Sequence, residues 1–455
     1  MKIYPVYSLL LCVFFILAGC KKNSEGGNPP SDSSPSVSGI SPTSGSKNTP
    51  VTITGNNFGI DASKVTVSFN GLAATIQSVA NTQIVALVPA KANTGKVTVN
   101  INGKSTDGPV FTYTISYTVS TVAGNGTRGL LDGAGANAEF GNPVSLVVDG
   151  SGNIFVADQY SNCIRKITAG NNPVVSTFAG SLTGTPGTDD GVGNSAKFGF
   201  PTGLAIDAQG NFIESDIAGA WSFIKKITAA AVVTTFTGKA GGGAGYKDGA
   251  LNVAQFNEPA GIALDAQGNI YVADFNNTCI RKISTAGIVS TLAGSPTPGN
   301  TDGTGAAASF RSPFGLALDA QGNIFVADPD NNSIRKITPA GIVSTYCGGP
   351  AHTGHADGDI SVARFMASKT IAIDAQGNMY VTDRSPNSGN ITTDYVRKIT
   401  PAGMVSTIAG SDLGYADGDG LHARFNQLNG ITADAQGNIY VSDGINYRIR
   451  KITAE

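Results

Sequence analysis

The sequence predicts an all-β protein with two folded regions, the second of them a ring of six similar units. Three observations support this prediction. The 455 residues include 59 glycines and only 14% charged residues, a composition that favours many short strands joined by turns. Residues 37–114 contain alternating segments separated by Gly, Asn and Pro. From Val119 to Glu455 the sequence repeats itself.

Residues 1–19 have the organisation of an export signal. Lys2 supplies a basic start, and the apolar run from Val6 to Ala18 is too short to span a bilayer comfortably. Because the segment ends in the letters L-A-G-C, it resembles a lipoprotein signal, in which cleavage leaves Cys20 as the lipidated N-terminus. The resemblance implies a membrane anchor. The alternative interpretation of the same segment is an ordinary buried helix.

Residues 20–36 are expected to form a flexible linker behind the lipidated cysteine. After Cys20 the segment is rich in Lys, Asn, Ser, Gly and Pro and has no apolar residue, so it cannot bury enough surface to fold. Lys21 stands where the inner-membrane retention signal of Gram-negative lipoproteins would place Asp. The resemblance therefore favours the outer membrane and leaves open whether the protein faces the cell surface or the periplasm.

The overall charge argues against nucleic acid as a partner. The formal net charge is −2, so the chain lacks the basic surface that neutralises phosphates. Cys163, Cys279 and Cys347 remain beyond the signal and the anchor, without metal-ligand spacing. Since Cys163 and Cys279 occupy matching places in two repeats, we expect small apolar fillers. No cofactor is expected, and we expect a monomer.

Residues 37–114 predict a small β-sandwich. Alternating strands are expected at 51–55, 64–71, 83–89 and 96–103. The run I-S-P with S-G from Ile40, and then T-I-T-G-N-N-F-G from Thr52, resembles an IPT/TIG domain, which has an immunoglobulin-like fold. Such domains often act as spacers, and this segment has no His, no Cys and no carboxylate cluster that would suggest another role.

Residues 119–455 predict a six-bladed β-propeller. Each unit offers four short strands, as at 259–265, 268–274, 279–283 and 289–294, and four strands per unit form a propeller blade. The motifs P-x-G-(I/L)-A-x-D, D-A-Q-G-N and N-x-x-I-R-K-I resemble the NHL repeat in all six units. The aspartates that end each second strand mark the units: Asp158, Asp216, Asp274, Asp328, Asp383 and Asp443.

The ring is expected to close through a strand from its beginning. The sixth unit stops after the I-R-K-I-T of its third strand, and Val119–Gly124 is a free copy of the missing fourth strand. We therefore predict that this copy pairs with the last blade, which removes an open sheet edge. Truncation of either end should then open the propeller.

Several repeated features are interpreted as scaffold. The D-A-Q-G-N segments are expected to be turns. An Asp-Gly pair precedes each inner strand, but calcium needs several oxygen ligands at alternate positions, which only 357–359 and 417–419 begin to offer. We expect Asx turns there, with a following Phe plugging the gap between blades, and a solvated rim of Arg and Lys from the I-R-K triplets. The aspartates are Asp132, Asp190, Asp248, Asp302, Asp357 and Asp417.

A ligand is expected on the face that carries the varied loops, because binding groups concentrate on variable loops of a rigid scaffold. Two residues into the inner strands the sequence reads Val144, Thr202, Ala260, Phe314, Lys369 and Asn429. Flanking loops add Tyr160, Phe200, Trp221, Phe275, Arg311, Arg384, Tyr395 and Tyr447. All except Val144 and Ala260 are candidate ligand-binding residues. Trp221 has two interpretations, a ligand platform or a plug buried between blades.

The resemblance also raises an enzymatic alternative. Some related six-bladed propellers are amidating lyases or lactonases with His or acidic metal ligands around the channel mouth. The chain has only three histidines, His352, His355 and His422. Together they could form a three-His zinc site, although no paired general base accompanies them. We favour a non-catalytic lipoprotein that binds a polysaccharide. A protein-docking scaffold at the cell envelope and a metal-dependent lyase or lactonase-like hydrolase are the alternatives.

Overall fold

The computed structural model describes residues 34–238, 243–386 and 392–455. The predicted signal at 1–19, Cys20 and all but the last three residues of the linker lie outside the described residues. Within the described ranges, no helix has the length and apolar character that a membrane crossing requires. The chain divides into two compact units, Met1–Tyr113 and Thr114–Glu455.

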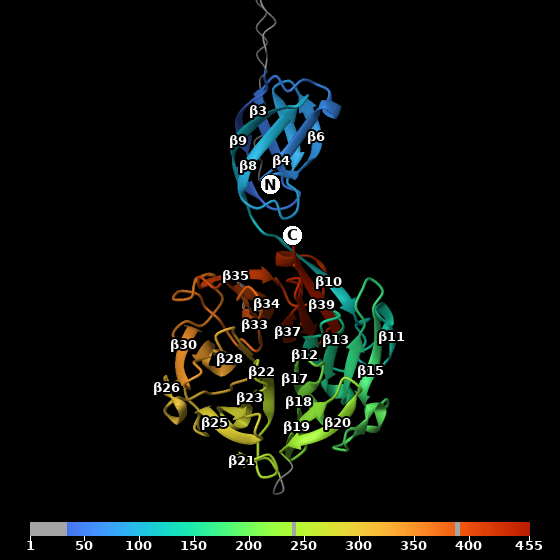
Figure 1. The fold of residues 1–455 in the computed structure, drawn as a ribbon, viewed down its shortest axis with the longest axis vertical. Coiled ribbons are helices and arrows are strands. Elements are labelled where there is room, and N and C mark those ends of the chain that lie inside the picture. Colours follow the sequence, from blue (N-terminus) through green and yellow to red (C-terminus); the bar gives the residue numbers. More distant parts are fainter. Residues whose placement is uncertain (1–33, 239–242, 387–391) are drawn as a thin grey trace, which may run out of the picture. The chain divides into compact units, whose positions relative to one another are not determined.

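The first unit is a sandwich of two sheets (Figure 1). One sheet has the order β1 (Ser36–Ser41), β3 (Pro50–Asn56), β7 (Gln83–Leu87) and β6 (Thr75–Ala80). The other has the order β2 (Ser44–Gly45), β9 (Lys104–Tyr113), β8 (Gly95–Ile101), β4 (Val65–Phe69) and β5 (Leu72–Ala73). A single turn of 3₁₀ helix, η1 (Ala62–Lys64), precedes β4. The predicted immunoglobulin-like sandwich is therefore confirmed.

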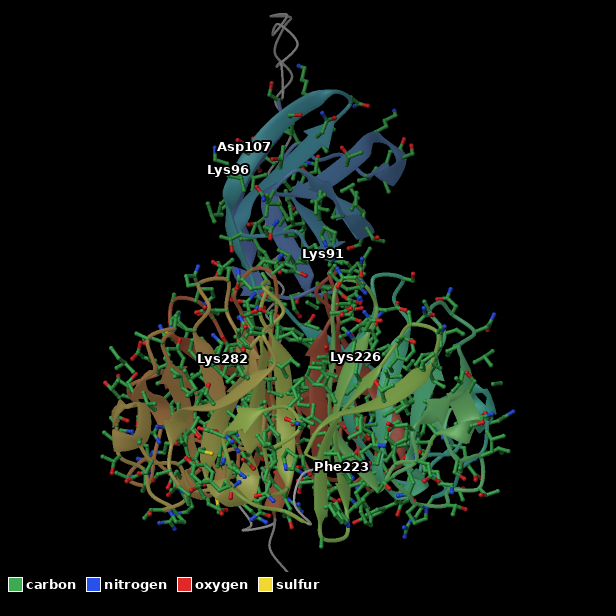
Figure 2. The ribbon with its side chains drawn as sticks, turned by 60° about the horizontal axis from the view of Figure 1, so that its bottom comes forward. Lys91, Lys96, Asp107, Phe223, Lys226 and Lys282 are labelled. Atoms are coloured by element: carbon green, nitrogen blue, oxygen red, sulfur yellow. The ribbon has the colours of Figure 1, made fainter. Side chains whose placement is uncertain are left out.

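The sandwich is held by residues that alternate along its strands. Val51 and Ile53 of β3 and Val97 and Val99 of β8 are fully buried, whereas the residues between them are not, as the two-residue period of a strand requires. Phe111 closes this core. The outer surface is polar: Lys96 and Asp107 form an exposed ion pair of 3.1 Å, which Figure 2 shows. Such a pair contributes little to stability.

The second unit is a propeller of six blades, each a sheet with four main strands and a two-residue strand at its outer edge. From the inside outward, blade one contains β12 (Pro143–Val148), β13 (Ile154–Asp158), β14 (Cys163–Ile167), β15 (Val174–Gly180) and β11 (Gly133–Ala134). Blade two contains β17 (Phe200–Ile206), β18 (Phe212–Ala218), β19 (Trp221–Ile227), β20 (Val232–Thr237) and β16 (Gly191–Val192). Blade three contains β22 (Pro259–Leu264), β23 (Ile270–Asp274), β24 (Cys279–Ile283), β25 (Ile288–Gly294) and β21 (Gly249–Ala250).

The other three blades repeat this plan. Blade four contains β27 (Leu316–Leu318), β28 (Ile324–Asp328), β29 (Ser333–Ile337), β30 (Ile342–Gly348) and β26 (Gly303–Thr304). Blade five contains β32 (Ile371–Ile373), β33 (Met379–Pro386), β34 (Thr392–Ile399), β35 (Met404–Ala409) and β31 (Gly358–Asp359). Blade six contains β37 (Leu428–Ala433), β38 (Ile439–Asp443), β39 (Arg448–Ala454), β10 (Tyr117–Ala123) and β36 (Gly418–Asp419). The inner strands contact one another around a closed ring (Figure 1).

Short 3₁₀ turns occupy the loops between these strands. In the loops that lead into a blade they are η2 (Gly135–Asn137), η4 (Gly193–Ser195), η6 (Gly305–Ala307) and η8 (Gly420–His422). Between the second and third strands they are η3 (Gln159–Ser161), η5 (Phe275–Asn277) and η7 (Pro329–Asn331). The D-A-Q-G-N turns form as expected: the carboxylate of Asp265 accepts the backbone N–H of Gln267 and of Asn269, at 3.0 and 2.8 Å.

The predicted closure of the ring is confirmed. β10 pairs antiparallel with β39, and Val119 lies opposite Ile452 while Thr121 lies opposite Arg450. The N–H of Glu455 donates to the carbonyl of Ser116 at 2.8 Å and extends the pairing beyond the strands. The fourth strand of blade six therefore comes from the start of the unit, as the missing strand in the sixth repeat predicts.

The core of the propeller lies between neighbouring blades. The phenylalanine after each Asp-Gly pair is completely buried in an apolar cluster that joins two blades, so the predicted plug is confirmed. Cys163 and Cys279 are also completely buried, in keeping with small apolar fillers. The plugs are Phe140, Phe198, Phe256, Phe310, Phe365 and Phe425.

The expectation of a solvated rim is wrong for the arginines. The arginine of every I-R-K triplet is 0% exposed. In blade three, Arg281 donates to Asp274 at 2.6 Å, to Asp248, and to the carbonyls of Gln255 and Lys247 at 3.0 and 2.9 Å. A guanidinium has five N–H donors, and burial is tolerated because these acceptors satisfy most of them. The equivalent arginines are Arg165, Arg335, Arg397 and Arg450.

The Asp-Gly aspartates are therefore ion-pair partners, and the expected Asx turn is wrong for them. Asp248 binds the Arg281 guanidinium and also accepts the backbone N–H of Thr291 in the fourth strand at 2.9 Å. One carboxylate thus fastens the incoming loop to the third and fourth strands. The local turn geometry belongs instead to Asp359 and Asp419, which accept the N–H of Ser361 and Leu421 two residues on.

Candidate functional site

Six residues at matching positions, four on the inner strands and two just before them, meet in one cavity, as their shared register in the repeat predicts. This mouth cavity has a volume of about 240 Å³ and lies at the end of the channel where the inner strands begin. A second cavity of about 360 Å³, lined by residues from all six inner strands, marks the channel itself. The mouth residues are Val144, Thr202, Ala260, Phe314, Lys369 and Asn429.

Loops of the varied face complete the mouth cavity. Tyr160 and Phe275 come from loops between second and third strands, which confirms that these loops share a face with those that lead into the blades. Phe275 meets Phe314 edge-on, with ring centroids 5.9 Å apart. The remaining lining residues are Asn142, Gln159, Ile217, Glu258 and Gln427. The cavity therefore combines aromatic rings, side-chain amides, one lysine and one glutamate.

The five remaining lining residues were not predicted from the sequence, and three of them share a single register. Asn142, Glu258 and Gln427 each stand two positions before a mouth residue, where blade two has Phe200. Glu258 and Gln427 have a left-handed backbone, with φ of 52° and 64°, which is uncommon for residues other than glycine. Their recurrence in one register next to the mouth residues is the signal that could have found them.

Hydrogen bonds between blades hold these loops in place. The N–H of Glu258 donates to Ser222 Oγ at 3.0 Å, and the N–H of Gln427 donates to an Asp394 carboxylate oxygen at 2.7 Å. In both cases the acceptor belongs to the preceding blade. Because each strained loop is tied to its neighbour, the mouth cavity is pre-organised, which lowers the cost of ordering its groups when a ligand binds.

Lys369 is the cation of the mouth cavity. Its Nζ donates to Asn429 Oδ1 at 2.8 Å and lies 4.8 Å from the centroid of the Phe314 ring. Burial and, to a smaller extent, the Arg384 guanidinium lower the pKa of Lys369 to about 8, against the opposing effect of Asp394. The amine is therefore mostly protonated at neutral pH.

Arg384 lies behind the mouth cavity. It pairs in register with Asp394 across β33 and β34 and lines a smaller cavity of about 60 Å³, which shares Lys369 and Gln427 with the larger one. Burial raises the pKa of Asp394. Arg384 thus contributes to the electrostatics of Lys369 from outside the mouth cavity.

The other predicted residues lie elsewhere. Phe200 meets Tyr160 edge-on, with centroids 6.2 Å apart, without lining the cavity. Trp221 is 37% exposed and stacks on Phe223, which Figure 2 labels, so it is not a plug between blades. Three further predicted residues are also absent from the lining: Arg311, which is exposed, Tyr395, which is 8% exposed, and Tyr447, which is half-buried against the core.

The three histidines do not converge. His422 is exposed and interacts with Asp419 at 2.9 Å, whereas the His355 ring packs 4.1 Å from that of Tyr395. Burial and the Arg397 guanidinium lower the pKa of His355 to about 4. Across the described ranges, no group of three or more His, Cys, Asp or Glu residues is placed to hold a metal ion. The three-His zinc alternative is therefore wrong for this arrangement.

Two larger cavities are weaker candidates for a ligand-binding site. One of about 930 Å³ lies on the opposite face and is lined by the D-A-Q-G-N turns of blades three to five. Those residues recur in the other blades, where the same contacts shape a turn. Another, of about 910 Å³, lies beside β10 and the loop before β15. The mouth cavity differs because its residues vary from blade to blade.

Blade two departs from the repeat inside the core. Lys225 replaces the buried arginine, and Glu214, its cross-strand partner, replaces the valine found in the other blades. Glu214 is completely buried, and its carboxylate oxygens have no full hydrogen bond among the described residues. Burial and the nearby Asp216 carboxylate raise the pKa of Glu214 well above 4.5. The group is therefore held protonated over much of the range in which an exposed glutamate is charged.

Replacing this group should stabilise the protein. We expect Glu214→Val to raise the free energy of unfolding at pH 7 by about 1–3 kcal/mol, because it removes an unsatisfied buried polar group. Since the raised pKa means that folding takes up a proton, wild-type stability falls as pH rises above 4.5. In the variant this fall should be shallower by up to about 1.4 kcal/mol per pH unit. Urea unfolding between pH 5 and 7 measures both effects.

Glu214→Gln is the matched control, because it keeps the volume and polarity and removes the titration. It should show the shallower pH dependence without the gain in stability. A Glu214→Val variant with unchanged stability and an unchanged pH slope would mean that Glu214 is solvated and ionised in the folded protein.

Comparison with known families assigns residues 35–117 to the IPT/TIG domain and residues 256–283 to the NHL repeat. With the six blades of the structure, these matches give the class: an all-β protein in which an immunoglobulin-like sandwich similar to the IPT/TIG domain precedes a six-bladed β-propeller, of which residues 256–283 match the NHL repeat.

Individual relatives share parts of this arrangement. Teneurin-3 of Mus musculus is 30% identical over 227 residues, or 44% of this chain and 8% of that protein. The chloroplastic protein SUPPRESSOR OF QUENCHING 1 of Arabidopsis thaliana is 25% identical over 281 residues, or 58% of this chain and 26% of that protein. The chain therefore spans about a quarter or less of the length of these curated relatives.

Solved structures match nearly the whole chain. A structural genomics protein of unknown function from Bacteroides thetaiotaomicron is 22% identical, with a TM-score of 0.60 over 94% of this chain and 100% of that chain. An auxiliary nutrient binding protein from Bacteroides ovatus is 20% identical, with a TM-score of 0.58 over 93% of this chain and 99% of that chain. At this level of identity the similarity shows the fold alone.

Proposed function

We propose that the protein is a non-catalytic ligand-binding lipoprotein of the cell envelope, and that its propeller binds an oligosaccharide or polysaccharide at the mouth cavity. The supporting observation is the convergence of six different side chains on one pre-organised cavity, beside the rings of Tyr160, Phe275 and Phe314. Aromatic faces beside amide and hydroxyl groups suit a sugar ring, which offers apolar C–H faces and a rim of hydroxyls.

The size of the cavity limits how much of the ligand enters it. At about 240 Å³ it is smaller than the roughly 300–1,000 Å³ of pockets that enclose a whole drug-sized ligand. It therefore suits one unit of a longer chain, with neighbouring units lying over the varied face. The name of the Bacteroides ovatus structure, an auxiliary nutrient binding protein, agrees with such a role.

The anchoring is part of the proposal. Lipidation at Cys20 and the linker of residues 20–36 would tether the two folded units to the outer membrane, at the cell surface or on the periplasmic face. The partners proposed are a glycan and the membrane, with no nucleic acid, and the protein acts as a monomer.

An array of immobilised oligosaccharides tests the binding role. The purified protein should be retained by a subset of glycans, and Phe275→Ala should weaken that binding about ten- to thirtyfold, because it removes an aromatic face from the cavity. Trp221→Ala is the matched control, since Trp221 is an aromatic residue outside the cavity, and it should bind like the wild type.

A different outcome would favour protein docking. If no oligosaccharide retains the wild type while a defined envelope protein co-purifies with it, the glycan proposal is contradicted. Equal losses from Phe275→Ala and Trp221→Ala would move the binding site away from the mouth cavity.

A further inference from the structure

The mouth cavity contains a charge that a neutral sugar does not need. The position of Lys369 is occupied in the other five blades by Val144, Thr202, Ala260, Phe314 and Asn429, none of which is charged. A lysine here is therefore not required by the geometry of a blade. Lys369 is half-buried, and because taking an ammonium group out of water costs free energy unless the group is paired, its presence calls for an explanation.

The described protein groups satisfy this lysine only in part. A protonated amine has three N–H donors, and Asn429 Oδ1 accepts one of them at 2.8 Å. The ring of Phe314 favours the positive charge but is a weak acceptor. No carboxylate in the described part of the chain lies within ion-pair distance of the Lys369 amine. The remaining N–H donors of the Lys369 amine and its positive charge are thus available to a ligand at the wall of the cavity.

Building on the proposed oligosaccharide-binding function, we infer that the sugar unit in the mouth cavity is acidic and places one anionic group against Lys369. An anion completes the hydrogen bonds of the amine and neutralises it in a partly desolvated site, where a charge-assisted hydrogen bond is stronger than a neutral one. The Asn429 amide nitrogen donates to Asn142 Oδ1 and to the carbonyl of Pro143, both at 3.4 Å, which holds its side-chain oxygen in place as the acceptor for Lys369.

The charge balance of the cavity favours a singly charged group. Lys369 is the cation among its lining residues, which also include the exposed Glu258. The single charge of a hexuronic acid carboxylate or a sulfate ester matches the single charge of Lys369, whereas a doubly charged phosphate brings a second negative charge that no cation of the lining offsets and that Glu258 repels. Both sources share this chemistry, and the experiment distinguishes them.

The lowered pKa of Lys369 predicts that ligand binding depends on pH. The groups that face it are Arg384, Asp394, Glu258 and Tyr160. With its pKa lowered to about 8, the amine is charged at pH 7 and loses its proton as the pH rises through that value. Affinity for an acidic sugar should therefore fall between pH 7 and 9.5 toward the affinity for its neutral counterpart, by at most about thirtyfold, whereas affinity for a neutral sugar should stay level.

The test uses matched pairs of immobilised oligosaccharides and the full chain. One arm compares hexuronic acid oligomers with their carboxyl-reduced, neutral counterparts, and the other compares sulfated oligomers with desulfated ones. The wild type should bind the acidic member of at least one pair tenfold or more tightly, and that arm identifies the anion. Lys369→Met should remove this preference and keep the binding of neutral members, because methionine retains the apolar stem without the charge.

Lys336→Met is the control, since Lys336 also lies over a phenylalanine ring, that of Phe325, but lines the cavity on the opposite face. It should leave the preference unchanged. Equal wild-type affinity for acidic and neutral members overturns the inference and leaves the proposed function intact, whereas no binding to any oligosaccharide overturns the proposed function as well. The pH profile of the wild type decides the matter if Lys369→Met does not fold: a flat profile for acidic members contradicts the role of Lys369.

Discussion

A chain that ends at Tyr447 is expected to lack a cooperatively folded propeller. The missing residues form β39, which lies between β38 and β10 in blade six. Their loss would leave the facing edges of both neighbours unpaired and remove two fully buried isoleucines, Ile449 and Ile452. It would also remove Arg450, which binds the buried Asp443 at 2.7 Å. The combined loss exceeds the roughly 5–15 kcal/mol that stabilises a typical domain.

Thermal unfolding followed by circular dichroism measures this result. The truncated chain should lose the propeller transition, while the first unit, which has its own core, keeps a separate one. Removal of Glu455 alone is the control and should cost only about 1–2 kcal/mol, because it removes the backbone pairing with Ser116 and leaves β39, which ends at Ala454, in place. A truncated chain with a propeller transition of normal size would show that the blade does not need this strand and that the ring is not closed by β10.

Arg281→Leu is expected to destabilise the propeller by about 3–5 kcal/mol, because it leaves the buried Asp274 without its charged partner. Burial already raises the pKa of Asp274 to about 6 against the opposing effect of Arg281, so folding takes up a proton and stability falls as pH rises toward that value. Without Arg281 the pKa should rise further, and the fall in stability should continue to higher pH. Urea unfolding at pH 5 and pH 8 should therefore show the larger loss at pH 8.

The adjacent residue provides the control. Lys282 is the next residue of the triplet, half-buried, with its amine 5.5 Å from the centroid of the Tyr271 ring. Lys282→Met should cost less than about 1 kcal/mol at either pH. If Arg281→Leu cost no more than Lys282→Met, the buried guanidinium would not be a structural centre of the blade.

The architecture of the propeller could be predicted because the repeat encodes it. The spacing of Asp158 and its five equivalents predicted the number of blades, and the incomplete sixth unit predicted a partner strand at Val119–Gly124.

The burial of the arginines could not be predicted in the same way. Their partners come from a loop 33 residues earlier and from the end of the preceding strand, as with Asp248 and Asp274 around Arg281. A triplet I-R-K read alone looks amphipathic. The signal that could have revealed the pair is that an Asp-Gly aspartate accompanies an arginine in five blades and Lys225 in blade two.

The candidate site was predictable where a strand fixes the direction of a side chain. Thr202 and Asn429 lie on the inner strands β17 and β37, and Phe314 and Lys369 occupy the matching positions two residues before β27 and β32, so the four residues meet in the mouth cavity. Loop residues have no such register. The turns after the second strands end in left-handed residues such as Thr278, so neighbouring side chains point in different directions. Phe275 accordingly reaches the cavity, whereas Trp221, in a blade whose loop lacks the 3₁₀ turn, packs on Phe223.

The most direct test of the central claim, that the closed ring presents one binding site at its mouth, is a crystal structure of the protein with an oligosaccharide that binds it. We predict a sugar ring in the mouth cavity, in contact with the aromatic pair of Phe275 and Phe314, with an anionic group within hydrogen-bond distance of Lys369 Nζ. A sugar bound instead to the D-A-Q-G-N face, to the outer edges of the blades or to the IPT/TIG domain, with the mouth cavity filled by water, would contradict it.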